Sequence, residues 1–83
     1  MARFMDVHDG FAGVTAGQLE AAHGRDLENE RAEGVRVEHA WLDPRQGKVF
    51  CLSTGPSADA VKRVHRQSGH PTDEVYELPV DVD

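Results

Sequence analysis

The chain has 83 residues and a net charge of −6, from 15 acidic and 9 basic residues. This balance argues against nucleic acid as a partner, because binding to phosphates needs a basic surface. No stretch approaches the ~20 apolar residues of a membrane span, and the first residues lack the apolar core of a signal peptide. We therefore expect a single cytoplasmic domain over residues 1–83 that contacts neither nucleic acid nor membrane.

The first predicted element is a strand over Arg3–His8. Alternate residues of a strand point to opposite sides, so Met5 and Val7 share one side. Because these two are apolar, we expect them to face the helices. Asp6 and His8 share the other side and form an Asp-x-His pair.

A helix follows, and its start is marked by a capping box in which Thr15 and Gln18 bond each other's backbone amides. The helix is predicted to run to about Glu33. On it, His23 and Asp26 are three residues apart and project together, so an imidazole and a carboxylate could share one ion. The same spacing is also ordinary for a solvated acidic helix face.

The next predicted strand, Val35–Leu42, alternates between two faces. Val37, His39 and Trp41 fall on one face and the intervening residues on the other. Trp41 has no evident place in the core of a monomer of this size.

A hairpin turn at 43–47 leads into a return strand, Lys48–Ser53, whose apolar interior holds the single cysteine, Cys51. A lone buried cysteine usually acts as a small hydrophobe. It gains chemical interest only if an imidazole such as that of His65 lies beside it. The pair could then form a Cys-His nucleophile or half of a site for a soft metal.

Ser57 caps the second predicted helix, which ends at Gly69. His65 lies at the apolar side of this helix, and His70 follows its end. A histidine in that position is often only a favourable partner for the helix dipole. The last predicted strand is Glu74–Val82.

The element order βαββαβ predicts an α+β fold of ferredoxin-like type, with a four-stranded antiparallel sheet and two helices on one face. Such a sheet leaves its other face uncovered. The core of so short a chain is marginal, and one cysteine cannot form an internal disulfide. We therefore expect a homodimer that covers the open face, and the alternative is a monomer with a polar open face.

The chain contains five histidines, and imidazole suits divalent ions of intermediate softness such as nickel, zinc or copper. Such an ion is therefore a plausible ligand. The chain contains none of the motifs CxxC, HExxH or GxGxxG, and no phosphate-binding loop. The spacing of residues therefore does not select one metal or one reaction.

Four segments resemble a family of small bacterial nickel-binding proteins, first described as a domain of unknown function. They are FMDVHDGFAGVT, AAHGRDL, EGVRVEHAWLDPRQGKVFCLS and GPSADAVKRVHRQSGHPTDEVYELPV, which together span nearly the whole chain. The resemblance implies a ferredoxin-like fold, a homodimer, and nickel bound by imidazole and oxygen ligands. The positions that match the family's pattern and could bind the metal are His8, His23, Asp26, Cys51, His65 and His70.

The leading hypothesis is a cytoplasmic protein that binds nickel or another divalent metal, with a role in metal storage or homeostasis. The alternative is a small enzyme or small-molecule-binding domain of the dimeric α/β-barrel type, which would need a pocket beside Cys51 and His65. The enzymatic reading is the less favoured of the two. A third hypothesis is an interaction module whose histidines have no role in binding its partner.

Overall fold

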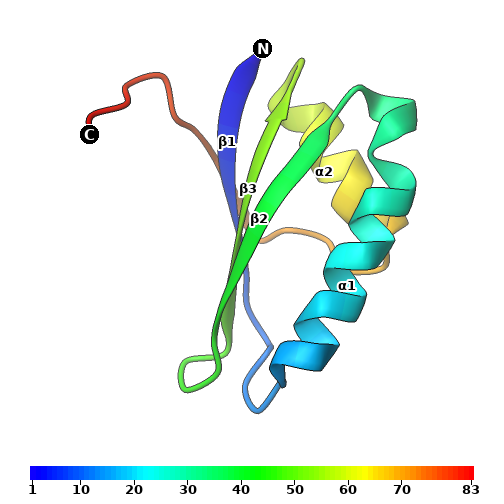
Figure 1. The fold of residues 1–83 in the computed structure, drawn as a ribbon, viewed down its shortest axis with the longest axis vertical. Coiled ribbons are helices and arrows are strands. Elements are labelled where there is room, and N and C mark those ends of the chain that lie inside the picture. Colours follow the sequence, from blue (N-terminus) through cyan, green and yellow to red (C-terminus); the bar gives the residue numbers. More distant parts are fainter.

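The computed structural model describes all 83 residues and has the α+β, ferredoxin-like fold (Figure 1). The strands occur in the order β2-β3-β1-β4, and every neighbouring pair is antiparallel. Both helices cover one face of the sheet, and no helix covers the other (Figure 1). The elements are β1 (Ala2–His8), α1 (Ala16–Asn29), the short 3-10 helix η1 (Arg31–Glu33), β2 (Arg36–Asp43), β3 (Lys48–Gly55), α2 (Ala58–Gln67) and β4 (Glu74–Glu77).

Both helices begin where the sequence predicts. The Thr15 side chain accepts a hydrogen bond from the Gln18 amide, and the Gln18 side chain accepts one from the Thr15 amide. The Ser57 hydroxyl accepts from the Ala60 amide at the start of α2. The first helix is shorter than predicted, because α1 ends at Asn29 and the chain reaches Glu33 through the tighter turns of η1.

The hydrophobic core lies between the sheet and α2. Val61 and Val64 of α2 are fully buried and belong to one apolar cluster with Phe4, Val49 and Cys51 of the sheet. This packing fixes α2 over β1 and β3, and so it places the polar residues of those elements near one another.

The predicted orientation of β1 is wrong. Phe4, Asp6 and His8 face the helices and are almost completely buried, whereas Met5 and Val7 lie on the other face. Apolarity favours Met5 and Val7 for the covered face, because burying a carboxylate and an imidazole is costly unless they are paired. In this chain the paired polar residues occupy the covered face.

The alternation predicted for β2 is also wrong beyond Val37. Val37 pairs with Ser53, and His39 pairs with Leu52. Two steps along β2 thus correspond to one step along β3, so β2 contains a β-bulge. The extra residue of a bulge reverses which side chains face the core. His39 and Trp41 therefore lie on the open face, although Val37 is buried.

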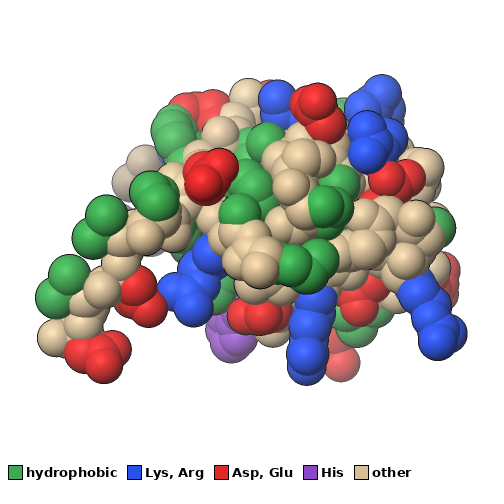
Figure 2. Space-filling model, turned by 90° about the horizontal axis from the view of Figure 1, so that it is seen from above, with side chains coloured by type: hydrophobic (Ala, Val, Ile, Leu, Met, Phe, Trp, Pro, Cys, Tyr) green, Lys and Arg blue, Asp and Glu red, His purple; other side chains and the backbone are tan.

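The last strand ends at Glu77, five residues earlier than predicted. Leu78 still donates its amide to the Arg3 carbonyl, but Pro79 has no amide hydrogen with which to continue the ladder. The final residues, which end at the C-terminus marked in Figure 1, stand away from the body of the molecule (Figure 1 and Figure 2). Neither α1 nor α2 has the length and the apolar character that a membrane-spanning helix needs.

Candidate metal centre

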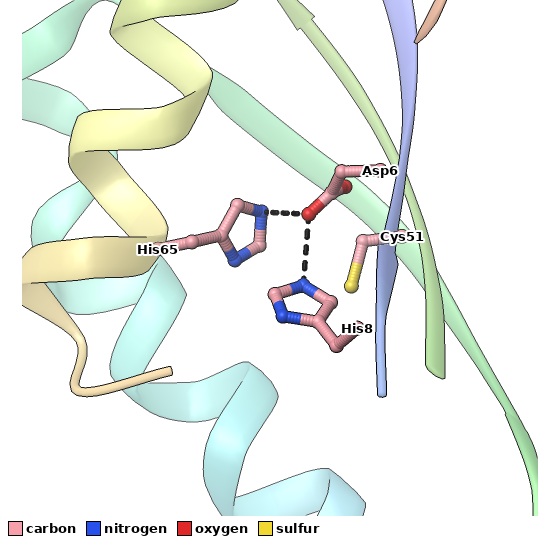
Figure 3. A group of neighbouring side chains, drawn as sticks. All are labelled: Asp6, His8, Cys51 and His65. Atoms are coloured by element: carbon pink, nitrogen blue, oxygen red, sulfur yellow. Dashed lines mark hydrogen bonds and ion pairs between the residues drawn. The ribbon is translucent and has the colours of Figure 1, made fainter. Parts of the chain in front are cut away.

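Four potential metal ligands gather between the sheet and α2 (Figure 3). Asp6 and His8 lie two residues apart on β1, so their side chains share one face of the strand. Cys51 is the partner of Asp6 in the β1–β3 ladder and lies beside it on that face. His65 reaches the group from α2. One ligand atom from each of the four residues lies within 4.8 Å of the others.

All four side chains are shielded from solvent. Asp6 and His65 have 0% of their surface exposed, His8 has 1% and Cys51 has 3%. Charged or polar groups at this depth are costly to bury, and in proteins they are usually paired or bound to a metal. A polar cluster in the core of so short a chain therefore indicates a functional site.

The carboxylate of Asp6 lies between two imidazoles (Figure 3). Its Oδ2 is 2.9 Å from Nε2 of His8 and 2.8 Å from Nε2 of His65. The contact with His65 has the distance of an ion pair without the alignment of a hydrogen bond. The other oxygen, Oδ1, is buried and has no hydrogen-bond partner.

A second group adjoins the first and shares His65 with it. Oδ1 of Asp26, on α1, is 3.1 Å from Nδ1 of His65 and 2.8 Å from Nε2 of His70. Asp26 is buried, and His70 follows the end of α2. The five residues form an unbroken series in which carboxylates and imidazoles alternate: His8, Asp6, His65, Asp26 and His70.

The charges of this series are mutually stabilising. Burial alone would lower the pKa of His65, but the carboxylates of Asp26 and Asp6 raise it to about 9. Burial would likewise raise the pKa of each carboxyl group, but the neighbouring imidazoles hold both values below the ordinary one. In the metal-free protein, two buried carboxylates thus flank a protonated His65.

The Cys51 thiol is held in its protonated form. Burial raises its pKa, and the negative charges of Asp6 and Asp26 raise it further. This environment is the opposite of the electropositive surroundings that activate a nucleophilic cysteine. It permits a thiolate only when a cation replaces the proton.

The pocket that the enzymatic alternative needs is not found beside Cys51. The structure has two cavities, and neither is lined by Cys51 or His65. One, of about 240 Å³, lies between α1 and β2, and its lining includes His23 and His39.

The structure brings together five of the six residues expected to bind metal, His8, Cys51 and His65 in one group and Asp26 and His70 in the other. His23 lies outside both groups. Asp6 was not among the expected ligands, although the Asp-x-His spacing on a strand could have indicated it.

The ferredoxin-like fold and the buried cluster of imidazole, carboxylate and thiol groups place this chain in the class of small candidate metal-binding proteins. The profile of one family, described as nickel responsive protein SCO4226-like, matches residues 4–78. The chain belongs to this family, as the sequence resemblance predicts.

The chain is also similar to a solved structure, described as the crystal structure analysis of SCO4226 from Streptomyces coelicolor A3(2). The two sequences are 52% identical, and the match covers 98% of this chain and 100% of the other, with a TM-score of 0.96. No curated protein matches significantly. The structural match confirms the predicted fold.

Proposed function

We propose that this protein binds nickel in the group formed by Asp6, His8, Cys51 and His65. The observation that carries the proposal is the approach of these four ligand atoms to within 4.8 Å of one another in the buried core. The buried Asp6 Oδ1, which has no hydrogen-bond partner, supports it, because a cation would satisfy that oxygen. The family description adds nickel as the metal to test first.

The chemistry of the four residues fits such an ion. Imidazole nitrogen, carboxylate oxygen and thiolate sulfur are all ligands of divalent first-row metals. The Asp6 carboxylate and the Cys51 thiolate would together neutralise an ion of charge +2. This neutrality matters in a core where an uncompensated charge is costly.

The orientation of His8 also fits metal binding. Its Nδ1 lies 3.1 Å from the carbonyl oxygen of Pro71. When Nδ1 donates its hydrogen to that carbonyl, Nε2 carries the lone pair and faces the cluster. Histidine ligands are commonly held in this way by a hydrogen bond at the nitrogen that does not bind the metal.

The proposed assembly is a homodimer in the cytoplasm, in which each chain of residues 1–83 acts as one unit in nickel storage or homeostasis. The open sheet face supports the dimer, because Trp41 and Tyr76 are 45% and 49% exposed there. Leu52 lies on β3, between β2, which carries Trp41, and β4, which carries Tyr76. It pairs with His39 on one side and with Met5 on the other. An apolar sheet face of this kind is usually covered by another surface.

Titration calorimetry of the tag-free, metal-free protein with nickel chloride tests the proposed site. We expect low-micromolar or tighter binding that is weakened at least tenfold in His8→Gln and in Cys51→Ser. The matched control is His39→Gln, because His39 is an exposed imidazole outside the cluster. Equal binding by wild type and His8→Gln, or loss of binding in His39→Gln, would contradict the proposal.

A further inference from the structure

Residues 78–83, called the tail below, leave the body of the molecule on the side of the sheet that no helix covers (Figure 1). They follow β4, which forms one edge of the sheet. The Leu78 amide donates to the Arg3 carbonyl, and no other backbone hydrogen bond joins the tail to the rest of the chain. The backbone of the tail is therefore free to pack against another surface.

An ion pair directs the tail towards the open sheet face. Oδ2 of Asp81 lies 3.0 Å from Nη1 of Arg3. Because side chains alternate along β1, Arg3 shares the open face with Met5. Both partners of the ion pair are exposed, and exposed ion pairs contribute little to stability. The contact thus sets the direction of the tail without burying it.

The tail carries an apolar side and an acidic side. Val80 and Val82 are 81% and 86% exposed. They alternate with Asp81 and Asp83, so in an extended chain the valines point one way and the carboxylates the other. Hydrophobic side chains stand along the protruding tail in Figure 2. Such a segment can bury its valines against another surface and leave its carboxylates in water.

We propose that the tail of each chain lies across the open sheet face of a second chain, with Val80 and Val82 packed beside Trp41 of that chain. This inference rests on the homodimer of the proposed function, and it adds an exchange of tails to the contact between the two sheets.

The positions of the sheet edges favour this contact. β2 and β4 form opposite edges, and they carry the exposed Trp41 and Tyr76. When two sheets pack face to face about a two-fold axis parallel to their strands, β4 of each chain lies opposite β2 of the other. A tail that leaves β4 then meets the surroundings of Trp41 on the second chain.

The tail is long enough to cross between the chains. Six extended residues span at most about 20 Å, and sheets that pack face to face lie about 10 Å apart. The exchange therefore needs no change in the four strands or in the helices.

The competing arrangement is a tail that folds back over the open face of its own chain. Neighbouring strands are about 4.8 Å apart, so β2 lies about 14 Å from β4 in the same sheet and within reach. Both arrangements bury the same valines. They differ in whether the tail approaches Trp41 of its own chain or Trp41 of the second chain.

Sedimentation equilibrium of the tag-free, metal-free protein tests the contribution of the tail to the dimer. We expect the dissociation constant to rise at least about tenfold in the Val80→Ser/Val82→Ser variant, because the buried apolar surface of two valines is lost. The matched control Asp83→Asn alters the acidic side of the tail and should dissociate as wild type does. A double variant that dimerises as tightly as wild type would overturn the proposal.

Fluorescence quenching identifies which chain the tail contacts, because Trp41 is the single tryptophan. A nitroxide attached to Asp83→Cys, in a chain that also carries Trp41→Phe, can quench only the tryptophan of a second, wild-type chain. We expect quenching in such mixed dimers. A nitroxide on Leu27→Cys, on the helical side, is the matched control and should cause none. Cys51 is buried and escapes labelling in the folded protein.

The possible failures are separable. Quenching that occurs only when the nitroxide and Trp41 are on the same chain would show a tail folded back on itself and overturn the exchange. A dimer without quenching in either mixture would also overturn it. A wild-type chain that stays monomeric would instead overturn the homodimer of the proposed function. None of these results depends on nickel, so the metal site stands or falls by its own titration.

Discussion

Burial and the neighbouring carboxylates have opposite effects on the pKa of His65. His65 lies against Asp6 of β1 and Asp26 of α1, with the rings of His8 and His70 nearby. The attraction of the two carboxylates exceeds the cost of burying its charge, because the pKa is raised from 6.5 to about 9. Protonation of the His65 ring therefore contributes to the stability of the metal-free fold.

The pH dependence of stability follows from these pKa values. A group whose pKa is higher in the folded state stabilises the fold fully below its unfolded pKa, so the contribution of His65 is complete below pH 6.5 and lost as pH rises through about 9. Asp26 has a lowered pKa, so its contribution is present above its usual value of 3.8 and lost as pH falls further. We expect the free energy of unfolding to be highest between about pH 4 and 6.5.

Urea denaturation of the metal-free protein, measured at several pH values, checks this prediction. The rise of the His65 pKa to about 9 in the folded state corresponds to a loss on the order of 3 kcal/mol between pH 6.5 and 9. The control His39→Gln should keep the same slope, because His39 is exposed and remote from the carboxylates. A profile that is flat over this range in wild type would show that the folded state does not hold His65 protonated.

The thiol of Cys51 should react slowly in the folded, metal-free protein. It is buried, and its pKa is raised by burial and by the charges of Asp6 and Asp26, so little thiolate is available for reaction. At pH 8 we expect modification by an aromatic disulfide reagent to be at least about tenfold slower than in the same protein unfolded in guanidinium chloride. Equal rates in the folded and unfolded states would mean that Cys51 is exposed.

At the scale of elements, the loop after β1 is attached to the β2–β3 hairpin beside the cluster. The Phe11 amide donates to the Gly47 carbonyl, and the rings of Phe11 and His8 meet edge to face at 6.1 Å between centroids. Gly47 has a φ of +71°, and a Cβ there would lie 2.6 Å from the Ala12 amide nitrogen. The hairpin and the loop thus fit together only when this residue is glycine.

Gly47→Ala should destabilise the protein more than Gly10→Ala does. Both positions have positive φ, which costs a residue other than glycine roughly 1–2 kcal/mol, but a Cβ at Gly10 meets nothing within 4 Å. We expect Gly47→Ala to cost at least about 1 kcal/mol more, because its Cβ displaces the backbone of the loop. Thermal or urea denaturation of the two variants measures the difference, and equal losses would contradict the close contact with Ala12.

The predictability of the fold differs from that of the site. Local signals were sufficient for the element order, since the capping side chains of Thr15 and Ser57 and the turn before Lys48 each act over a few residues. The orientation of β1 was not predictable from hydrophobicity. Its covered face carries Asp6 and His8, and their burial is compensated only by partners distant in sequence, chiefly His65.

The bulge in β2 limited prediction in a different way. One additional residue between Val37 and His39 reverses the alternation, and no residue in that stretch signals it. The same limit applies to the cluster, because Asp6 and Asp26 come from different elements and meet only through His65. The sequence supplied candidate ligands, but the packing of α2 on the sheet determines which of them meet.

At the scale of the whole molecule, one side of the sheet is covered by helices (Figure 1). The other side carries exposed apolar side chains. Trp41 pairs with Phe50, which in turn pairs with Val7, so an apolar row crosses three strands. In a homodimer this row would meet its counterpart on the second chain. A large aromatic residue that becomes buried in such an interface often contributes a large part of the binding energy.

Trp41→Glu should therefore weaken the proposed homodimer while leaving the fold intact, because the altered side chain is exposed in the single chain. We expect the dissociation constant from sedimentation equilibrium to rise at least about 30-fold, which corresponds to about 2 kcal/mol. The matched control is Leu27→Glu, because Leu27 is 46% exposed on α1, on the helical side of the molecule. If Trp41→Glu associates as tightly as wild type, or if Leu27→Glu is the variant that dissociates, the second chain does not bind at the open sheet face.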